Sequence, residues 1–208
     1  MTIAQALAAY LVAAGLLTLT PGLDTALILR TAAVEGPKRA ALAAIGISVG
    51  CLIWGAAVAL GLGALLQAST LAFTALKWAG AAYLVWLGLN LLLKPRERFE
   101  VAAGRRTGGS DVTWMRRGLL TNLLNPKIGV FYISFLPQFL PQGVQAAPFI
   151  FLLALIHVVL GTAWSGCLIA ATRPIANALK RPEVVRWLDR ATAVVFLGFG
   201  VRLALERR

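Results

Sequence analysis

Apolar residues fill most of this chain in long blocks that short polar segments separate. A helix needs about 20 apolar residues to cross the roughly 30 Å hydrocarbon core of a bilayer, and six blocks reach that length. The six predicted spans are Ile3–Leu29, Ala40–Leu66, Leu71–Leu93, Gly118–Leu140, Pro148–Ala171 and Leu188–Leu205. The pattern therefore predicts an all-α integral membrane protein with six transmembrane helices.

The composition agrees with a chain that is surrounded by lipid. Hydrophobic residues make up 59% of the 208 positions and charged residues 13%, against about 45–50% and about 25% in soluble domains. The same figures exclude intrinsic disorder and a disulfide scaffold. Two distant cysteines, Cys51 and Cys167, make neither a disulfide framework nor a zinc site, so we expect no metal and no cofactor. Residues 1–29 contain no Lys or Arg, so we expect the first block to be a membrane span and not a cleaved leader.

Basic residues outnumber acidic ones by 20 to 8, which gives a formal net charge of +12. In a soluble chain this excess would indicate a nucleic-acid partner, but here it follows the connections between spans. Fourteen of the 20 basic residues lie between spans 1 and 2, 3 and 4, or 5 and 6, and the connections 67–70 and 141–147 contain none. Because Lys and Arg mark cytoplasmic loops, we expect these three loops in the cytoplasm, the N-terminus outside, and no nucleic-acid partner.

A polar segment divides the chain into two halves with three predicted spans each. We interpret 1–208 as a single transmembrane domain that consists of one repeat at 1–93, a cytoplasmic linker at 94–117 and a second repeat at 118–208. The halves are weakly similar, since GCLI occurs at both 50–53 and 166–169. Because three spans precede the second half, the two repeats have inverted topology, which is typical of many secondary transporters.

The first and fourth predicted spans each contain a proline at a corresponding place, Pro21 and Pro126. A proline inside a helix removes a hydrogen-bond donor and frees the carbonyl four residues earlier. Each proline lies nine residues from a basic residue that marks the cytoplasmic boundary, Arg30 and Arg117. At 1.5 Å per residue both breaks lie about 13–14 Å deep, near the middle of the bilayer. The sequence thus predicts that helices 1 and 4 are broken and that the two breaks face each other.

Both breaks have the residues of a helix start. Thr20 and Asn125 are favourable N-cap residues, and each precedes a proline that we expect at the first helical position. The N-terminus of a half-helix attracts a carboxylate, while the carbonyls freed upstream, at Leu17 and Asn122, attract an ammonium group or another cation. A site with both properties suits a zwitterion such as an amino acid.

Asp24, Lys127 and His157 are ionisable residues deep inside the predicted spans. A charge at this depth costs at least about 2.5–3.5 kcal/mol and needs a partner or a function. We interpret Asp24 as neutralising a substrate amine or carrying a proton and Lys127 as holding a carboxylate; the alternative is that the two simply pair. His157, near the middle of span 5, is either a proton relay or a hydrogen-bonded structural residue.

Three segments carry a resemblance to a known family. They are 20–25 (TPGLDT), 79–88 (AGAAYLVWLG) and 118–127 (GLLTNLLNPK), the last followed by FLPQF at 135–139. Together they resemble the signatures of the LysE/RhtB family of amino-acid exporters over nearly the whole chain. One departure is Leu23, which stands where the family usually has a second proline.

The resemblance implies a permease of the plasma membrane, in bacteria the inner membrane, that exports amino acids or close analogues by proton antiport. It implies a transporter and not an enzyme, with the transport site at the two proline segments. The candidate substrate-binding residues are Thr20, Pro21, Gly22, Asp24, Asn122, Asn125, Pro126 and Lys127, and the candidate proton-coupling residues are Asp24 and His157.

Two other function classes stay open at this point. A heavy-metal cation exporter would need soft ligands, of which two Cys and two Met are few. A membrane thiol-disulfide oxidoreductase would use Cys51 and Cys167, which occupy corresponding places in spans 2 and 5. The chain lacks the Gly-x-x-x-x-Gly-Lys-Ser/Thr loop of nucleotide-driven pumps. Small residues such as Gly46-x-x-x-Gly50 permit close helix contact or a homodimer.

Overall fold

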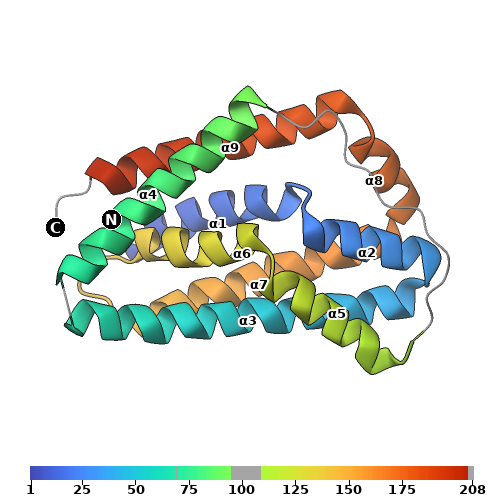
Figure 1. The fold of residues 1–208 in the computed structure, drawn as a ribbon, viewed down its shortest axis with the longest axis horizontal. Coiled ribbons are helices and arrows are strands. Elements are labelled where there is room, and N and C mark those ends of the chain that lie inside the picture. The colour runs from blue at the N-terminus through green and yellow to red at the C-terminus, as the bar shows by residue number, and fades with distance from the viewer. Residues whose placement is uncertain (69, 95–108, 206–208) are drawn as a thin grey trace.

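The computed structural model describes residues 1–68, 70–94 and 109–205, and all regular structure within these ranges is helical (Figure 1). This confirms the predicted all-α class. The α-helices are α1 (Ile3–Leu19), α2 (Leu23–Val34), α3 (Pro37–Ala68), α4 (Thr70–Leu93), α5 (Asp111–Leu123), α6 (Pro126–Val130), α7 (Ala146–Ala170), α8 (Thr172–Leu179) and α9 (Pro182–Leu205). A π-helix, η1 (Phe131–Phe135), and a 3₁₀-helix, η2 (Leu136–Phe139), continue α6.

The described residues contain two to four candidate membrane spans by length and composition. The stretch Pro37–Gly61 of α3 and the whole of α7 are each long and apolar enough to cross a membrane. Two further pairs reach that length only together, α1 with α2 at a bend of 51° and α5 with Pro126–Phe139 at a bend of 53°. Helices α4 and α9 cover the predicted third and sixth spans, and the count of six spans stays a prediction.

One helix of each bent pair, α1 or α6, lies in the middle of the fold. Figure 1 shows α1 and α6 between the α3–α7 side and the α4–α9 side. Helix α3 packs along α5 and α7, helix α4 packs along α9, and α1 contacts both α7 and α9. This arrangement surrounds the two breaks with unbroken helices from both halves of the chain.

Close contact between α3 and α5 depends on glycine. A Cβ atom on Gly46 would lie 2.0 Å from the carbonyl oxygen of Met115, and one on Gly118 would lie 2.0 Å from that of Ala43. A Cβ atom on Gly50 would lie 2.6 Å from Oδ1 of Asn122. The Gly46-x-x-x-Gly50 pair therefore serves a contact inside the chain, where small residues let two helix backbones approach closely.

Aromatic side chains fill the core beside the second break. Tyr10 of α1 and Phe131, Phe135 and Phe139 of the η1–η2 segment are all buried. The rings of Tyr10 and Phe139 meet edge to face with centroids 5.2 Å apart, and those of Phe131 and Phe135 stack at 4.8 Å. The hydroxyl of Tyr10 donates a hydrogen bond of 2.9 Å to the carbonyl of Leu153. Each such ring buries a large apolar area, so this cluster fixes α1 against η2 and α7.

The polar segments contain more helix than predicted. Helix α5 begins at Asp111, where Ser110 caps it by accepting a 3.3 Å hydrogen bond from the amide of Thr113. The last seven residues of the predicted linker 94–117 are therefore helical, and residues 95–108 lie outside the described residues. Helix α8 and the start of α9 likewise occupy the predicted loop between spans 5 and 6.

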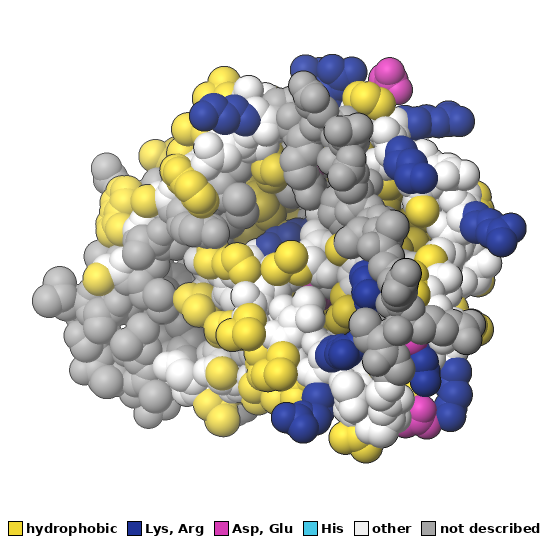
Figure 2. Space-filling model, turned by 45° about the vertical axis from the view of Figure 1, so that its right-hand side comes forward, with side chains coloured by type: hydrophobic (Ala, Val, Ile, Leu, Met, Phe, Trp, Pro, Cys, Tyr) yellow, Lys and Arg dark blue, Asp and Glu magenta, His cyan; other side chains and the backbone are white. Residues whose placement is uncertain are grey.

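Basic side chains gather toward one end of the molecule, whereas much of the remaining described surface is apolar (Figure 2). An exposed salt bridge of 2.8 Å between Lys38 and Asp111 links the start of α3 to the start of α5 at this end. Large apolar side chains such as Trp78, Trp86 and Val159 are exposed elsewhere. Such a surface fits a body in contact with lipid and an end in contact with water.

Replacing Gly46 with alanine is expected to destabilise the fold, because the new methyl group meets a backbone carbonyl that only a shift of α5 can move away. Overpacking of this kind typically costs about 1–3 kcal/mol. Gly166→Ala is the matched control, since a methyl group at that position meets nothing within 4 Å. Thermal unfolding in detergent checks this: Gly46→Ala should melt at a lower temperature than the control, and equal midpoints would contradict the close α3–α5 contact.

Candidate functional site

The first break separates α1 from α2 at Thr20, Pro21 and Gly22. Both the amide and the hydroxyl of Thr20 donate to the carbonyl of Leu16, at 2.9 and 2.7 Å. The Thr20 hydroxyl accepts in turn from the hydroxyl of Thr192 on α9. The prediction that Thr20 caps α2 and that Pro21 begins it was wrong: Gly22 is the N-cap and Leu23 the first helical residue, because the Thr20 hydroxyl is used to end α1.

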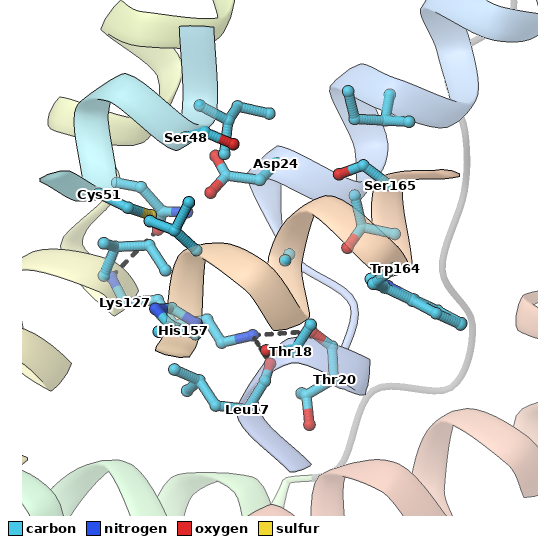
Figure 3. A pocket seen from close by; sticks show the side chains of 18 of the residues that line it. Leu17, Thr18, Thr20, Asp24, Ser48, Cys51, Lys127, His157, Trp164 and Ser165 are labelled. Carbon is cyan, nitrogen blue, oxygen red and sulfur yellow. Dashed lines mark hydrogen bonds between the residues drawn. The ribbon is translucent and has the colours of Figure 1, made fainter. Parts of the chain in front are cut away.

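Lys127 of the second half satisfies the carbonyls that the first break leaves free. Pro21 has no N–H to offer to the carbonyl of Leu17. The Lys127 ammonium donates hydrogen bonds of 2.8 Å to the Leu17 carbonyl and 2.7 Å to the Thr20 carbonyl (Figure 3). The predicted affinity of these carbonyls for an ammonium group is thus met by a group of the protein itself.

The second break follows the predicted chemistry more closely. Asn125 is the N-cap of α6, its side-chain oxygen accepts from the Lys127 amide at 3.1 Å, and Pro126 occupies the first helical position. The Asn122 carbonyl, which Pro126 leaves without its helical partner, accepts from the Asn125 amide at 3.0 Å. This break therefore satisfies its freed carbonyl within one turn.

Asp24 of the first half accepts a hydrogen bond from a residue of the second half. The side-chain amide of Asn122 donates a 2.8 Å hydrogen bond to Oδ2 of Asp24 and a 3.4 Å contact to the sulfur of Cys51. Asn122 is fully buried, and Asp24 lies in the first turn of α2, where the helix dipole favours a negative charge. Asp24 and Lys127 thus each form hydrogen bonds with a group of the other half.

A cavity of about 70 Å³ lies on one side of the breaks, between α2, α3, α6 and α7; we call it the α7-side cavity. An apolar cavity of 150 Å³ accommodates benzene, so this one is small. Its polar side chains come from several helices (Figure 3). They are Thr18, Thr20, Asp24, Thr25, Ser48, Cys51, Asn125, Lys127, His157, Trp164 and Ser165.

A second cavity, of about 230 Å³, lies on the other side of the breaks; we call it the α9-side cavity. Leu91 of α4 and Thr192 and Phe196 of α9 form its outer wall. The breaks form its inner wall. Four residues line both cavities, namely Thr20, Gly22, Asn125 and Lys127. The breaks therefore separate two hollows, with the Lys127 side chain between them.

The structure brings the predicted site residues together around these two hollows. Asp24 and His157 line only the α7-side cavity, and Pro21 and Pro126 line only the α9-side cavity. Asn122 lines neither and acts through its bond to Asp24.

His157 has both a structural bond and a place in the cavity wall. It is buried on α7, and its Nδ1 forms a 3.0 Å hydrogen bond with the hydroxyl of Tyr132. Its ring lies 5.4 Å from that of Phe131, at the edge of the aromatic core. The position of His157 is therefore compatible with both interpretations from the sequence, a hydrogen-bonded structural residue and a proton relay.

The family model described as LysE type translocator matches residues 16–207. The chain belongs to this family.

Several relatives of this LysE-type translocator are similar over nearly their whole length. The chain is 33% identical to a homoserine/homoserine lactone efflux protein of Salmonella typhi, with 96% of both chains covered. It is 30% identical to a leucine efflux protein of Klebsiella pneumoniae, over 94% of this chain and 92% of the relative. It is 31% identical to an uncharacterised membrane protein of Vibrio cholerae, over 96% of both. No solved structure matches the chain.

The polar residues of the α7-side cavity that were not predicted from the sequence of this LysE-type translocator include Thr18, Ser48, Trp164 and Ser165. For the residues among these that carry a hydroxyl group, the available signal was the occurrence of hydroxyl groups inside otherwise apolar spans. Ser48 also forms a 3.1 Å hydrogen bond with Thr162, which joins α3 to α7.

The two cysteines of this LysE-type translocator have different surroundings. Cys51 is buried beside Asn122, whereas Cys167 is exposed on α7, and both are free thiols. Nothing in these positions favours a thiol relay.

Replacing Lys127 with methionine is expected to destabilise the protein by about 1–3 kcal/mol, because two partly buried carbonyls lose their donor. Lys180→Met, at an exposed position, is the matched control and should unfold like the unmodified chain. Denaturant unfolding in detergent measures both. Equal stability of Lys127→Met and the control would show that the ammonium is dispensable to the first break.

Proposed function

We propose that the chain is a secondary active exporter of amino acids or close analogues in the plasma membrane. The observation that carries the proposal is the meeting of two broken helices from opposite halves at one cavity lined by Asp24 and Lys127. The relatives named for homoserine and leucine efflux support the same substrate class. Corresponding broken helices in two halves are the feature that best points to a transporter's binding site.

In this proposal six spans form two inverted three-helix repeats, 1–93 and 118–208. The loops 1–2, 3–4 and 5–6 lie in the cytoplasm and the N-terminus lies outside. The gathering of basic side chains at one end supports this orientation, because Lys and Arg are enriched in cytoplasmic loops.

The substrate amine binds Asp24. Its Oδ2 accepts from Asn122, but its Oδ1 is buried without a hydrogen-bond partner among the described residues. A buried carboxylate oxygen of this kind is costly until it is paired, and a substrate ammonium supplies the pair. The carboxylate of the same zwitterion binds at the N-terminus of α2, where Gly22 caps without a side-chain acceptor and leaves backbone N–H groups available.

Lys127 shapes the binding site more than it binds directly. Its ammonium holds the carbonyls of Leu17 and Thr20, so it keeps the first break open beside Gly22. The complete proposed substrate-binding set is Thr20, Pro21, Gly22, Asp24, Asn122, Asn125, Pro126 and Lys127.

Proton antiport follows if the substrate and a proton compete for one carboxylate. Oδ1 of Asp24 can bind a proton or an ammonium group, but not both at once. A proton that arrives from outside therefore displaces the substrate amine, and His157, on the wall of the same cavity, relays it. One charge crossing 100 mV supplies about 2.3 kcal/mol, enough for a gradient of about 50-fold in a neutral zwitterion.

Asp24→Asn is expected to abolish export driven by a pH gradient while the protein still reaches the membrane. The asparagine keeps a polar group of the same shape but cannot carry the proton. Loss of a charge-assisted hydrogen bond to the substrate amine, worth about 1.5–3 kcal/mol, also weakens substrate binding by about tenfold or more. The measurement is efflux of homoserine and leucine from proteoliposomes with an imposed pH gradient.

Asp111→Asn is the matched control, because this exposed acid lies at the start of α5 and bonds only to surface Lys38 among the described side chains. It should export at the unmodified rate. Substrate exchange at equal pH separates the two roles of Asp24: exchange that persists assigns it to the proton, and exchange that is lost assigns it to the amine. Undiminished gradient-driven export by Asp24→Asn would exclude Asp24 from the mechanism.

A further inference from the structure

Two buried hydroxyl groups on the wall of the α7-side cavity are left without a partner in the described part of the chain. They belong to Thr25 of α2 and Ser165 of α7, which are only 6% and 8% exposed. Neither hydroxyl forms a hydrogen bond with another described residue. A buried hydroxyl in this state costs free energy until something bonds to it, so the wall of this cavity favours a ligand with a matching polar group.

Other hydroxyl groups on the same wall are already bonded within the protein. The hydroxyl of Thr18 donates a 2.7 Å hydrogen bond to the carbonyl of Ala14. That of Ser48 bonds to the hydroxyl of Thr162 at 3.1 Å. The bonded hydroxyls serve to join or terminate helices, whereas the two unbonded ones keep their capacity for a ligand.

The Ser165 hydroxyl lies beside an open space on the same face of α7. The residues of α7 that line the cavity are His157, Val158, Gly161, Trp164, Ser165 and Leu168. Their spacing of three and four residues places them on one face of the helix. A Cβ atom on Gly161 would meet nothing within 4 Å, and Ser165 follows one helical turn later, about 6 Å along the axis. Gly161 thus leaves room for a ligand next to Ser165.

We propose that the space over Gly161 receives the side chain of the exported amino acid and that Ser165 binds a hydroxyl group on that side chain. The inference rests on the proposed function, in which Asp24 binds the substrate amine from the α2 side of the same cavity (Figure 3). Thr25, the next residue of α2, supplies a second hydroxyl contact. The preferred substrates are therefore small hydroxylated amino acids, such as serine or threonine.

The preference follows from the chemistry of the wall and the size of the cavity. A serine hydroxyl both donates and accepts hydrogen bonds, as does a substrate hydroxyl. An aliphatic side chain of the same shape would displace water from Ser165 and leave its hydroxyl unbonded, which weakens binding. The cavity volume of about 70 Å³ is less than half of the roughly 150 Å³ that accommodates benzene, which favours small side chains.

Isothermal titration of the detergent-solubilised protein with threonine and with valine tests the proposal, because the two side chains have nearly the same shape. The unmodified protein should bind threonine at least about tenfold more tightly, since only threonine can bond to Ser165. Ser165→Ala should reduce this preference to about twofold or less by weakening threonine binding, with valine affinity almost unchanged. Retained valine binding shows that the variant is folded.

Two matched controls separate the hydroxyl contact from a general effect on the cavity. Thr18→Ala removes a hydroxyl from the same wall that is already bonded to the Ala14 carbonyl, so the preference for threonine should persist. Gly161→Ala should weaken threonine and valine alike, by about fivefold or more, because its methyl group takes up the space for the side chain. Gly166→Ala, on an exposed part of α7 with equally open surroundings, should bind both like the unmodified protein.

Equal binding of threonine and valine by the unmodified protein, or no binding of either, would overturn the proposal. A preference that survives in Ser165→Ala, or one that Thr18→Ala abolishes equally, would also overturn it. Efflux of both amino acids from proteoliposomes distinguishes this result from a failure of the proposed function. Preferential binding of threonine without export would refute the exporter and leave the hydroxyl site standing, whereas export of both with equal affinity would refute the hydroxyl site alone.

Discussion

A backbone carbonyl without a hydrogen bond costs several kcal/mol in hydrocarbon, and this constraint governs how the two halves of the molecule meet. Pro21 creates such a carbonyl at Leu17, because the proline has no N–H to donate to it. The ammonium of Lys127 donates to it instead, at 2.8 Å. In the other direction, Asn122 of the second half donates to Asp24 of the first at 2.8 Å. Each half thus receives a hydrogen bond from the other half at one of its polar groups.

The same bonds define the space available for a substrate. Because Lys127 and Gly22 line both the α7-side and the α9-side cavity, a movement of the Lys127 side chain changes both hollows at once. In the proposed export cycle, one small movement of Lys127 would therefore open the site toward either the α7-side or the α9-side cavity. The buried aromatic rings around Phe131 and Phe135 resist movement at the adjoining end of α6, so we expect the change to be concentrated at the break itself.

Much of this architecture could be predicted from the sequence, because long apolar blocks and internal prolines have direct consequences in lipid. The prediction that Asn125 caps α6 was confirmed, because it depends only on the residues beside the proline. The prediction that Thr20 caps α2 was wrong, since a threonine hydroxyl can donate to the preceding carbonyl of Leu16 as readily as it can accept from an amide of the following helix. The partners of Asp24 and Lys127 depend on which helix faces meet across about 100 residues, and periodicity alone does not settle that. For the same reason Trp164 was not identified as a cavity residue.

A double-mutant cycle between Pro21 and Lys127 tests the central claim most directly. Pro21→Ala restores an N–H that can bond to the Leu17 carbonyl, so the carbonyl then needs Lys127 less. The free energy of unfolding in detergent should fall by less for Lys127→Met in the Pro21→Ala background than in the unmodified chain, with a coupling energy of about 1 kcal/mol or more. Strict additivity of the two changes would contradict the account, because the ammonium would then stabilise the protein independently of the broken helix.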